Sequence, residues 1–173
     1  MMHIYMHSED ARLVNLLGAV ATVVRDALLD ADVSGSGSAA IISAGSHDGQ
    51  SVDELSRVLG LSHSATVRLV DRLEGRGAVR RVRDRQDRRT TRLHLTAKGR
   101  RTRRALLAAR SATLHALVAE LPAASKDAME ASLSELLRGR PTTREEALRT
   151  CRFCDEDVCR PRGCPVELAS QGA

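Results

Sequence analysis

The stretch that determines the fold is SVDELSRVLGLSHSATVRLVDRLEGRGAVRRVRDRQDRRTTRLHLTAKG, residues 51–99. Its first segment predicts a short helix with a clear beginning and end. Ser51 stands at the cap position and Glu54 follows three residues later, which is the capping-box pattern. Gly60 stands where a residue in the left-handed conformation would end this helix.

A second helix follows almost at once. Ser62 can cap it, Gly75 and Gly77 end it, and its apolar stripe consists of Val67, Val70 and Leu73. Two capped helices joined by a turn that contains glycine predict a helix-turn-helix. The opposite face and its flanks hold small polar residues near the N-terminus and arginines further along: Ser64, Ala65, Thr66, Arg68, Leu69 and Arg72. A helix that enters the major groove of DNA needs a face of this kind.

A β-hairpin is expected after the second helix. Residues 78–83 and 90–95 are runs in which β-branched and polar residues alternate, and they flank the highly charged sequence DRQDRR at 84–89. A helix-turn-helix followed by a basic hairpin predicts a winged helix. The expected fold class is therefore mainly α, with a small β-hairpin as the wing.

Further helices are predicted on both sides of this unit. Apolar residues recur at helical spacing over 8–30, Thr96 can cap a long helix that reaches Glu120, and another helix covers 125–138. The sequence AAIISAG predicts a short buried helix that Gly45 ends, after a break at SGSGS. The outer helices hold more apolar surface than a small winged domain can bury, so we expect a homodimer.

The positive charge of the chain is concentrated in one segment. Residues 76–104 contain twelve Arg and one Lys against two Asp, a net charge of +11, while the whole chain carries only +5. The rest of the chain is therefore acidic. A strongly positive block in an otherwise acidic molecule creates a local field that suits a polyphosphate backbone.

Composition excludes several classes of protein. Tyr5 and Phe153 are the only aromatic residues among 173, so base stacking on unpaired strands is excluded and duplex is the expected nucleic-acid partner. No apolar run approaches the roughly 18 residues of a membrane span, and the start MMHIYMHSED lacks a signal-peptide pattern. We expect a cytoplasmic protein with no membrane partner. No set of nucleophile, base and oxyanion donors predicts an enzyme.

Residues 54–99 resemble the core of the MarR family of bacterial transcription regulators, and the resemblance extends more weakly over 8–138. Its most specific elements are the wing sequence DRQDRR leading into LTAKG, and the Leu-Gly-Leu-Ser turn before the second helix. The resemblance implies a winged-helix homodimer whose terminal helices dimerise. Its recognition helices would enter successive major grooves of a palindromic operator, and its wings would reach the neighbouring minor grooves. Many members of the family bind small aromatic acids as effectors, but this chain has little aromatic or lysine character in the corresponding region.

Individual roles follow from the resemblance by position. Ser64, Thr66 and Arg68 would contact bases or lie near them, and Arg72 would contact a phosphate. Arg85 and Arg88 would be the wing-tip arginines. Asp87 and Arg89 occupy positions where the family often holds the wing together by an ion pair, so they are expected to be structural.

The cysteines form the most specific chemical signal in the chain. All four lie in the last 23 residues with the spacing C-x2-C-x4-C-x4-C, at Cys151, Cys154, Cys159 and Cys164. Four thiols match the ligand set of a tetrahedral zinc ion, and the spacing matches that of zinc knuckles with Cys159 where those have His. The alternatives are an iron–sulfur cluster, loosely similar to that of the SoxR regulators, and thiol or disulfide chemistry. The spacing alone does not select the metal.

Two parts of the chain are therefore expected, a DNA-binding and dimerisation part at 1–140 and a cysteine-rich metal-binding tail at 141–173. The leading functional hypothesis is a sequence-specific dimeric transcription regulator, more specifically a repressor. One alternative is an iron–sulfur redox sensor, and another is a thiol oxidoreductase that uses Cys151 and Cys154. A third is a chromatin-type protein that binds DNA through the basic block without sequence preference.

Overall fold

The computed structural model of the protein describes residues 8–84 and 90–170. The predicted roles of Arg85, Asp87, Arg88 and Arg89 lie outside the described residues. The elements, in chain order, are α1 (Ser8–Asp30), α2 (Ser36–Ser46), α3 (Val52–Leu59), α4 (His63–Gly75), β1 (Val79–Arg83), β2 (Thr91–Leu95), α5 (Ala97–Val118), α6 (Ala123–Leu137), α7 (Arg144–Cys151), α8 (Glu156–Cys159), the 3₁₀ helix η1 (Arg160–Arg162) and α9 (Pro165–Ser170).

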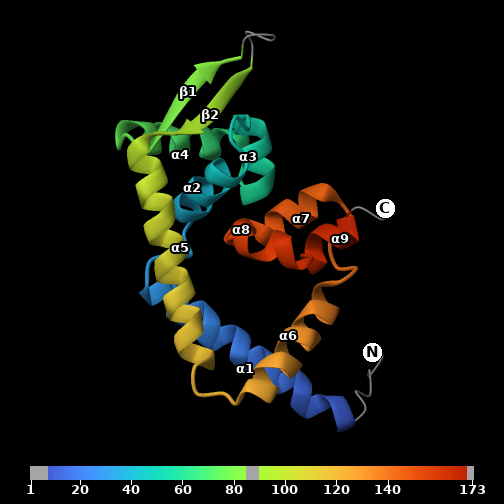
Figure 1. The fold of residues 1–173 in the computed structure, drawn as a ribbon. Coiled ribbons are helices and arrows are strands. Elements are labelled where there is room, and N and C mark those ends of the chain that lie inside the picture. Colours follow the sequence, from blue (N-terminus) through green and yellow to red (C-terminus); the bar gives the residue numbers. More distant parts are fainter. Residues whose placement is uncertain (1–7, 85–89, 171–173) are drawn as a thin grey trace, which may run out of the picture.

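The elements form a winged helix at one end of the long helix α5 and a pair of helices at the other (Figure 1). Helices α2, α3 and α4 and the antiparallel hairpin β1–β2 make up the winged unit, while α1 and α6 lie at the far end of α5. Helices α7, α8 and α9 return to the winged unit, where α7 packs against α3. The predicted fold class, mainly α with a hairpin wing, is confirmed. Within 8–84 and 90–170, no helix has the length and apolar character of a membrane span.

Local capping signals set the helix-turn-helix as the sequence predicts. The Ser51 hydroxyl accepts a hydrogen bond from the Glu54 N–H at 3.2 Å, and the Glu54 carboxylate accepts one from the Ser51 N–H at 2.6 Å. Gly60 ends α3 with φ +64°, in the left-handed region that favours glycine. The backbone hydrogen bond from Ser51 holds the pKa of Glu54 below its usual value, although partial burial opposes it.

Helix α2 differs from the prediction at both ends. It begins at Ser36, within the stretch expected to break the chain, and it continues through Gly45 to Ser46. Gly45 is instead a packing position, because a Cβ there would overlap the Arg103 side chain of α5. Gly45 thus lies at a close approach of α2 and α5, where an added Cβ would displace the Arg103 side chain, and it does not end the helix.

The hydrophobic core lies between the winged-unit helices and the hairpin. Its buried members are Ala40, Ile41, Ala44, Leu55, Leu69, Val70, Leu73, Ala78, Val79, Leu93 and Leu95. On α4 the buried face consists of Thr66, Leu69, Val70 and Leu73. The predicted stripe was right for Val70 and Leu73 but wrong in placing Leu69 on the opposite face, while Val67 is only half-buried. Both the observed face and the predicted face have residues three and four positions apart, so the spacing alone does not distinguish them.

The hairpin and α5 meet at a tight junction. In the hairpin, Val79 is opposite Leu95 and Arg83 is opposite Thr91. Directly after β2, Thr96 caps α5 by accepting from the Gly99 N–H at 3.0 Å and donates to the Gly77 carbonyl at 2.6 Å. Gly99 packs so closely on the Ala78 carbonyl that an added Cβ would overlap it. The wing is thereby fixed to the start of the long helix.

Substitution of Gly99 by Ala should therefore destabilise the protein. The overlap is with backbone on the hairpin, which cannot move away without breaking the Thr96 N–H to Ala78 O hydrogen bond of 3.0 Å. The expected loss is about 1–3 kcal/mol in the free energy of unfolding, measured by denaturant titration. Gly75→Ala is the control, because nothing lies within 4 Å of the added Cβ. Equal stability of both variants would contradict the close contact.

Candidate nucleic-acid interface and cysteine pocket

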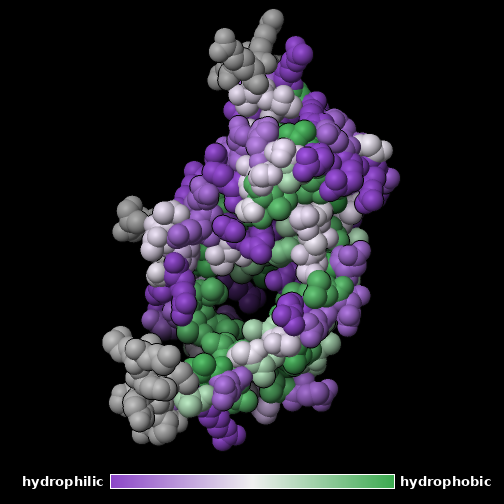
Figure 2. All heavy atoms as spheres, turned by 180° about the vertical axis from the view of Figure 1, so that it is seen from behind, coloured by the Kyte–Doolittle hydropathy of each residue, from purple (hydrophilic) through white to green (hydrophobic). Residues whose placement is uncertain are grey.

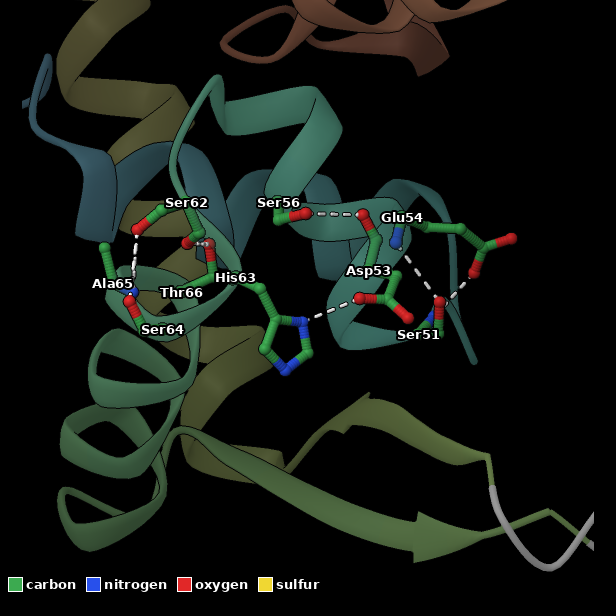
Figure 3. Close-up of polar contacts among 9 residues, drawn as sticks. All are labelled: Ser51, Asp53, Glu54, Ser56, Ser62, His63, Ser64, Ala65 and Thr66. Carbon is green, nitrogen blue, oxygen red and sulfur yellow. Dashed lines mark hydrogen bonds and ion pairs between the residues drawn. The ribbon is translucent and has the colours of Figure 1, made fainter.

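The N-terminus of α4 is held in a fixed position on α3. Ser62 caps α4 by accepting from the Ala65 N–H at 3.2 Å, and the next side chain, His63, points back to α3 (Figure 3). There its Nδ1 lies 2.7 Å from Asp53 Oδ1. These contacts tie the two helices of the helix-turn-helix together at their exposed ends.

The structure separates the residues predicted to contact bases. Ser64, Arg68 and Arg72 have exposed side chains on α4. Thr66 is fully buried, with 0% of its surface exposed, and its hydroxyl donates to the Ser62 carbonyl at 3.0 Å. The prediction of a base contact for Thr66 is therefore wrong, because this side chain faces the core and its hydrogen bond is satisfied within the helix.

The exposed arginines of α4 are available to a ligand. Among the described residues, no carboxylate forms an ion pair with Arg68 or Arg72. Further exposed arginines lie in the turn after α4, on β1 and near the start of α5: Arg76, Arg80, Arg83, Arg101 and Arg104. Much of the positive charge of the basic block is therefore exposed on the winged unit and the adjoining part of α5.

Two arginines of the same block have structural roles. Arg81 donates to Glu74 at 2.5 Å and to Asp71 at 2.7 Å, which fastens β1 to the end of α4. Burial by itself would lower the Arg81 pKa, but the hydrogen bonds from its guanidinium to Asp71 and Glu74 outweigh burial and raise it. Arg92 similarly lies 2.7 Å from Asp84 across the hairpin. These ion pairs, which were not predicted, hold the described part of the wing.

The four cysteines lie close to one another. They line one pocket of about 430 Å³ between the C-terminal helices and the end of α2, together with His47 and Glu156. Cys151 and Cys154 are hydrogen-bonded to one another, and so are Cys159 and Cys164. Among the described residues, no group of three or more His, Cys, Asp and Glu side chains already has metal-binding geometry.

The two thiols of the first pair have opposite electrostatic environments. The hydrogen bond from Cys151 lowers the pKa of Cys154 to about 7 against the effect of burial, and the nearby Arg110 lowers it further. The same hydrogen bond, with burial, raises the pKa of Cys151. Burial, followed by the charges of Cys154 and Cys164, raises the pKa of Cys159. The thiols thus act on one another across the pocket.

The contact that joins this pocket to the winged unit was not predicted from the sequence. His47, which follows α2, lies 3.2 Å from the Glu156 carboxylate of α8, and Arg160 lies 2.7 Å from the same carboxylate. The hydrogen bond with His47 holds the pKa of Glu156 below its usual value despite burial. The two residues are 109 positions apart, so no local pattern could reveal the pair.

Comparisons of the sequence and the structure with known proteins agree with a winged helix-turn-helix. The model of the MarR family matches residues 40–91, which run from within α2 through α3, α4 and β1 to the first residue of β2. A MarR family protein from Bacillus stearothermophilus has a similar structure with a TM-score of 0.64 and 27% identity, over 76% of this chain and 95% of that one. This is the fold of the MarR family. No match to a curated protein was found.

Two other structures extend the likeness to the MarR fold. A transcriptional regulator of the MarR family from Rhodococcus sp. RHA1 has 27% identity and a TM-score of 0.54, over 76% of this chain and 95% of that one. CouR from Rhodococcus jostii RHA1, bound to p-coumaroyl-CoA, has 28% identity and a TM-score of 0.51, over 72% and 87%. The four cysteines lie outside the residues that match the MarR family model.

Arg81→Ala should destabilise this MarR-like winged unit. The change removes two ion pairs from a side chain that is 25% exposed and leaves Glu74 and Asp71 facing one another. We expect a loss of about 1–3 kcal/mol, measured by thermal or denaturant unfolding. The neighbouring Arg80→Ala is the control, because Arg80 is exposed on the same strand. A larger loss for the control would show that Arg81 does not hold the wing.

Proposed function

We propose that the chain is a sequence-specific regulator of transcription that binds duplex DNA as a homodimer. The observation that carries the proposal is the face of α4 on which Ser64, Arg68 and Arg72 are exposed, next in the chain to a basic hairpin. An arginine can contact guanine with two hydrogen bonds in the major groove, and a short polar side chain near the helix N-terminus can approach a base edge. Arg72, further along α4, would contact a phosphate.

The wing would supply a second set of contacts. Arg80 and Arg83 extend the exposed positive surface along β1 toward the predicted tip residues Arg85 and Arg88. We propose that the wing reaches the minor groove beside the major groove that α4 enters. FabT of Streptococcus pneumoniae was solved in complex with DNA, and its 23% identity and TM-score of 0.59 show a shared fold.

The proposed dimer interface is the apolar surface of α1 and α6. The exposed large hydrophobic residues of these helices are Leu13, Val14, Leu16, Leu17, Val20, Val23, Leu29, Met129, Leu133, Leu136 and Leu137. Seen from behind, hydrophobic residues gather over the lower half of the molecule, where these helices lie (Figure 2). A surface of this extent is costly in water, and a second copy related by a two-fold axis would cover it with the same residues.

This dimer suggests both the operator and the mode of action. A two-fold dimer presents two recognition helices to two inverted half-sites, so the operator would be palindromic. A dimer bound to a promoter blocks RNA polymerase without further contacts. This favours a repressor over an activator. We place the protein in the cytoplasm, bound to the nucleoid when it occupies its operator.

Arg68→Ala should separate base reading from phosphate binding. If Arg68 contacts a base, operator affinity should fall by about 1–3 kcal/mol while affinity for random duplex changes little. The measurement is fluorescence anisotropy at fixed salt, with an operator selected from a random duplex pool. The control is Arg162→Ala, which removes the same charge from an exposed arginine of the tail.

Two results would count against this assignment. Equal losses on operator and random duplex would make Arg68 a phosphate contact. Equal affinity of the parent protein for selected and random duplex would favour a chromatin-type protein over a sequence-specific regulator.

The dimer interface is tested by Leu16→Glu combined with Leu133→Glu. Both side chains are about half exposed in the single chain, at 52% and 48%, so the monomer should tolerate the charges while the dimer should not. Light scattering should show a monomer that keeps its helical circular dichroism. Val158→Glu, equally exposed at 57% but in the tail, should remain dimeric. A double variant that still forms the parent dimer would place the interface elsewhere.

A further inference from the structure

The four cysteines lie at the ends of the short helices of the tail, so the backbone brings them together. Cys151 is the last residue of α7, and the Cys154 N–H donates to its carbonyl at 2.7 Å in the following turn. Cys159 is the last residue of α8, and Cys164 directly precedes α9. The chain turns between these points and places all four thiols on one pocket.

Apart from the packing of α7 on α3 and of α9 on α6 and α7, the tail has little to hold it in this shape. Of the described side chains from 142 to 167, only Ala147 and Val166 are buried and apolar. The helices there are 8, 4, 3 and 6 residues long. Helices of this length are unstable alone in water, and so small a core cannot offset their loss of conformational entropy. Small domains of this kind depend on a disulfide or a bound metal.

We propose that Cys151, Cys154, Cys159 and Cys164 bind one zinc ion as thiolates in a tetrahedral site, and that the ion stabilises the folded tail. Each thiol releases its proton to solvent when the ion binds, and no electron is transferred. The thiols must turn from their paired hydrogen bonds toward a common centre, because the described side chains do not yet surround an ion.

The ligand set suits a single ion. Four thiols that line one pocket are the ligand set of a structural tetrahedral zinc ion. An iron–sulfur cluster takes the same four thiolates, and the colour and metal content of the protein distinguish the two.

The surroundings supply positive charge to the site. Four thiolates and one Zn²⁺ carry a net charge of −2, and the guanidinium of Arg110 is a positive charge that acts on Cys154. The carboxylates of Asp155 and Glu156 oppose this effect, but Glu156 is itself paired with His47 and Arg160. His47 and Glu156 thus have partners of their own, which leaves the thiols as the ligands.

The tail also contacts the rest of the molecule through ion pairs. Three ion pairs connect the tail to the winged unit and α5: Glu145 with Arg57 at 3.8 Å, Glu156 with His47 at 3.2 Å and Asp157 with Arg103 at 3.9 Å. A zinc ion that fixes α7 and α8 relative to one another would hold these contacts in place together.

The first test is the metal content and colour of the full chain purified without oxygen. About one zinc per chain, a colourless protein and, after replacement by cobalt, the absorption of a tetrahedral thiolate site are expected. Cys159→Ser should lower zinc affinity at least tenfold, while Val158→Ala, an exposed neighbour, should bind as the parent does. A metal-free protein, or a brown protein with the charge-transfer absorption of an iron–sulfur cluster, would overturn the proposal.

The second test uses the parent protein and avoids any variant that fails to fold. Chelator removal of the metal should accelerate amide hydrogen exchange over residues 144–167, and α3 and α4 should stay protected. Zinc should restore the protection. Unchanged exchange after complete metal removal would show that the ion does not stabilise the tail. Disulfides within the four cysteines of the anaerobically purified protein would assign them to redox chemistry instead.

Discussion

The burial of one face of α4 is the constraint on which the winged unit depends. Leu69, Val70 and Leu73 enter the core together with Thr66, whose hydroxyl is satisfied by the backbone of its own helix. Because a helix is rigid, fixing this face also fixes the direction of every other side chain on it. Ser64, Arg68 and Arg72 are exposed as a result of what is buried.

The contacts around α4 add precision to this arrangement. His63 holds the start of the helix against Asp53, and Arg81 holds its end to the hairpin through Asp71 and Glu74. The basic segment thus contains two kinds of arginine. Some, such as Arg81 and Arg92, are bound to carboxylates of the protein, and others remain on the surface for an external anion. A sum of charges over the segment cannot distinguish them.

What the sequence predicted well depends on interactions between near neighbours. The capping box of Ser51 and Glu54, the caps at Ser62 and Thr96 and the end of α3 at Gly60 each involve residues within a few positions, and all are present. The burial of Leu69 and Thr66 was predicted wrongly, because two apolar faces related by a small rotation fit the same spacing. Gly45 was read as a helix end, since its close neighbour Arg103 lies on a distant segment. The position of the tail could not be predicted at all, because Glu156 meets His47 only after the chain has folded.

Because the tail returns to the winged unit, the helices of the molecule form a closed ring of contacts. Helix α6 follows α5 in the chain and also packs against α9, while α9 packs on α7 and α7 on α3 (Figure 1). Helix α6 is therefore connected to the winged unit in two ways. One connection is the long helix α5, and the other is the packing of the C-terminal helices. In an open chain, the hinge after α5 could bend without resistance from elsewhere. In this ring of contacts, a bend between α5 and α6 must disturb the packing of α9 and α7. Loss of that packing would in turn allow α6 to change its angle to α5.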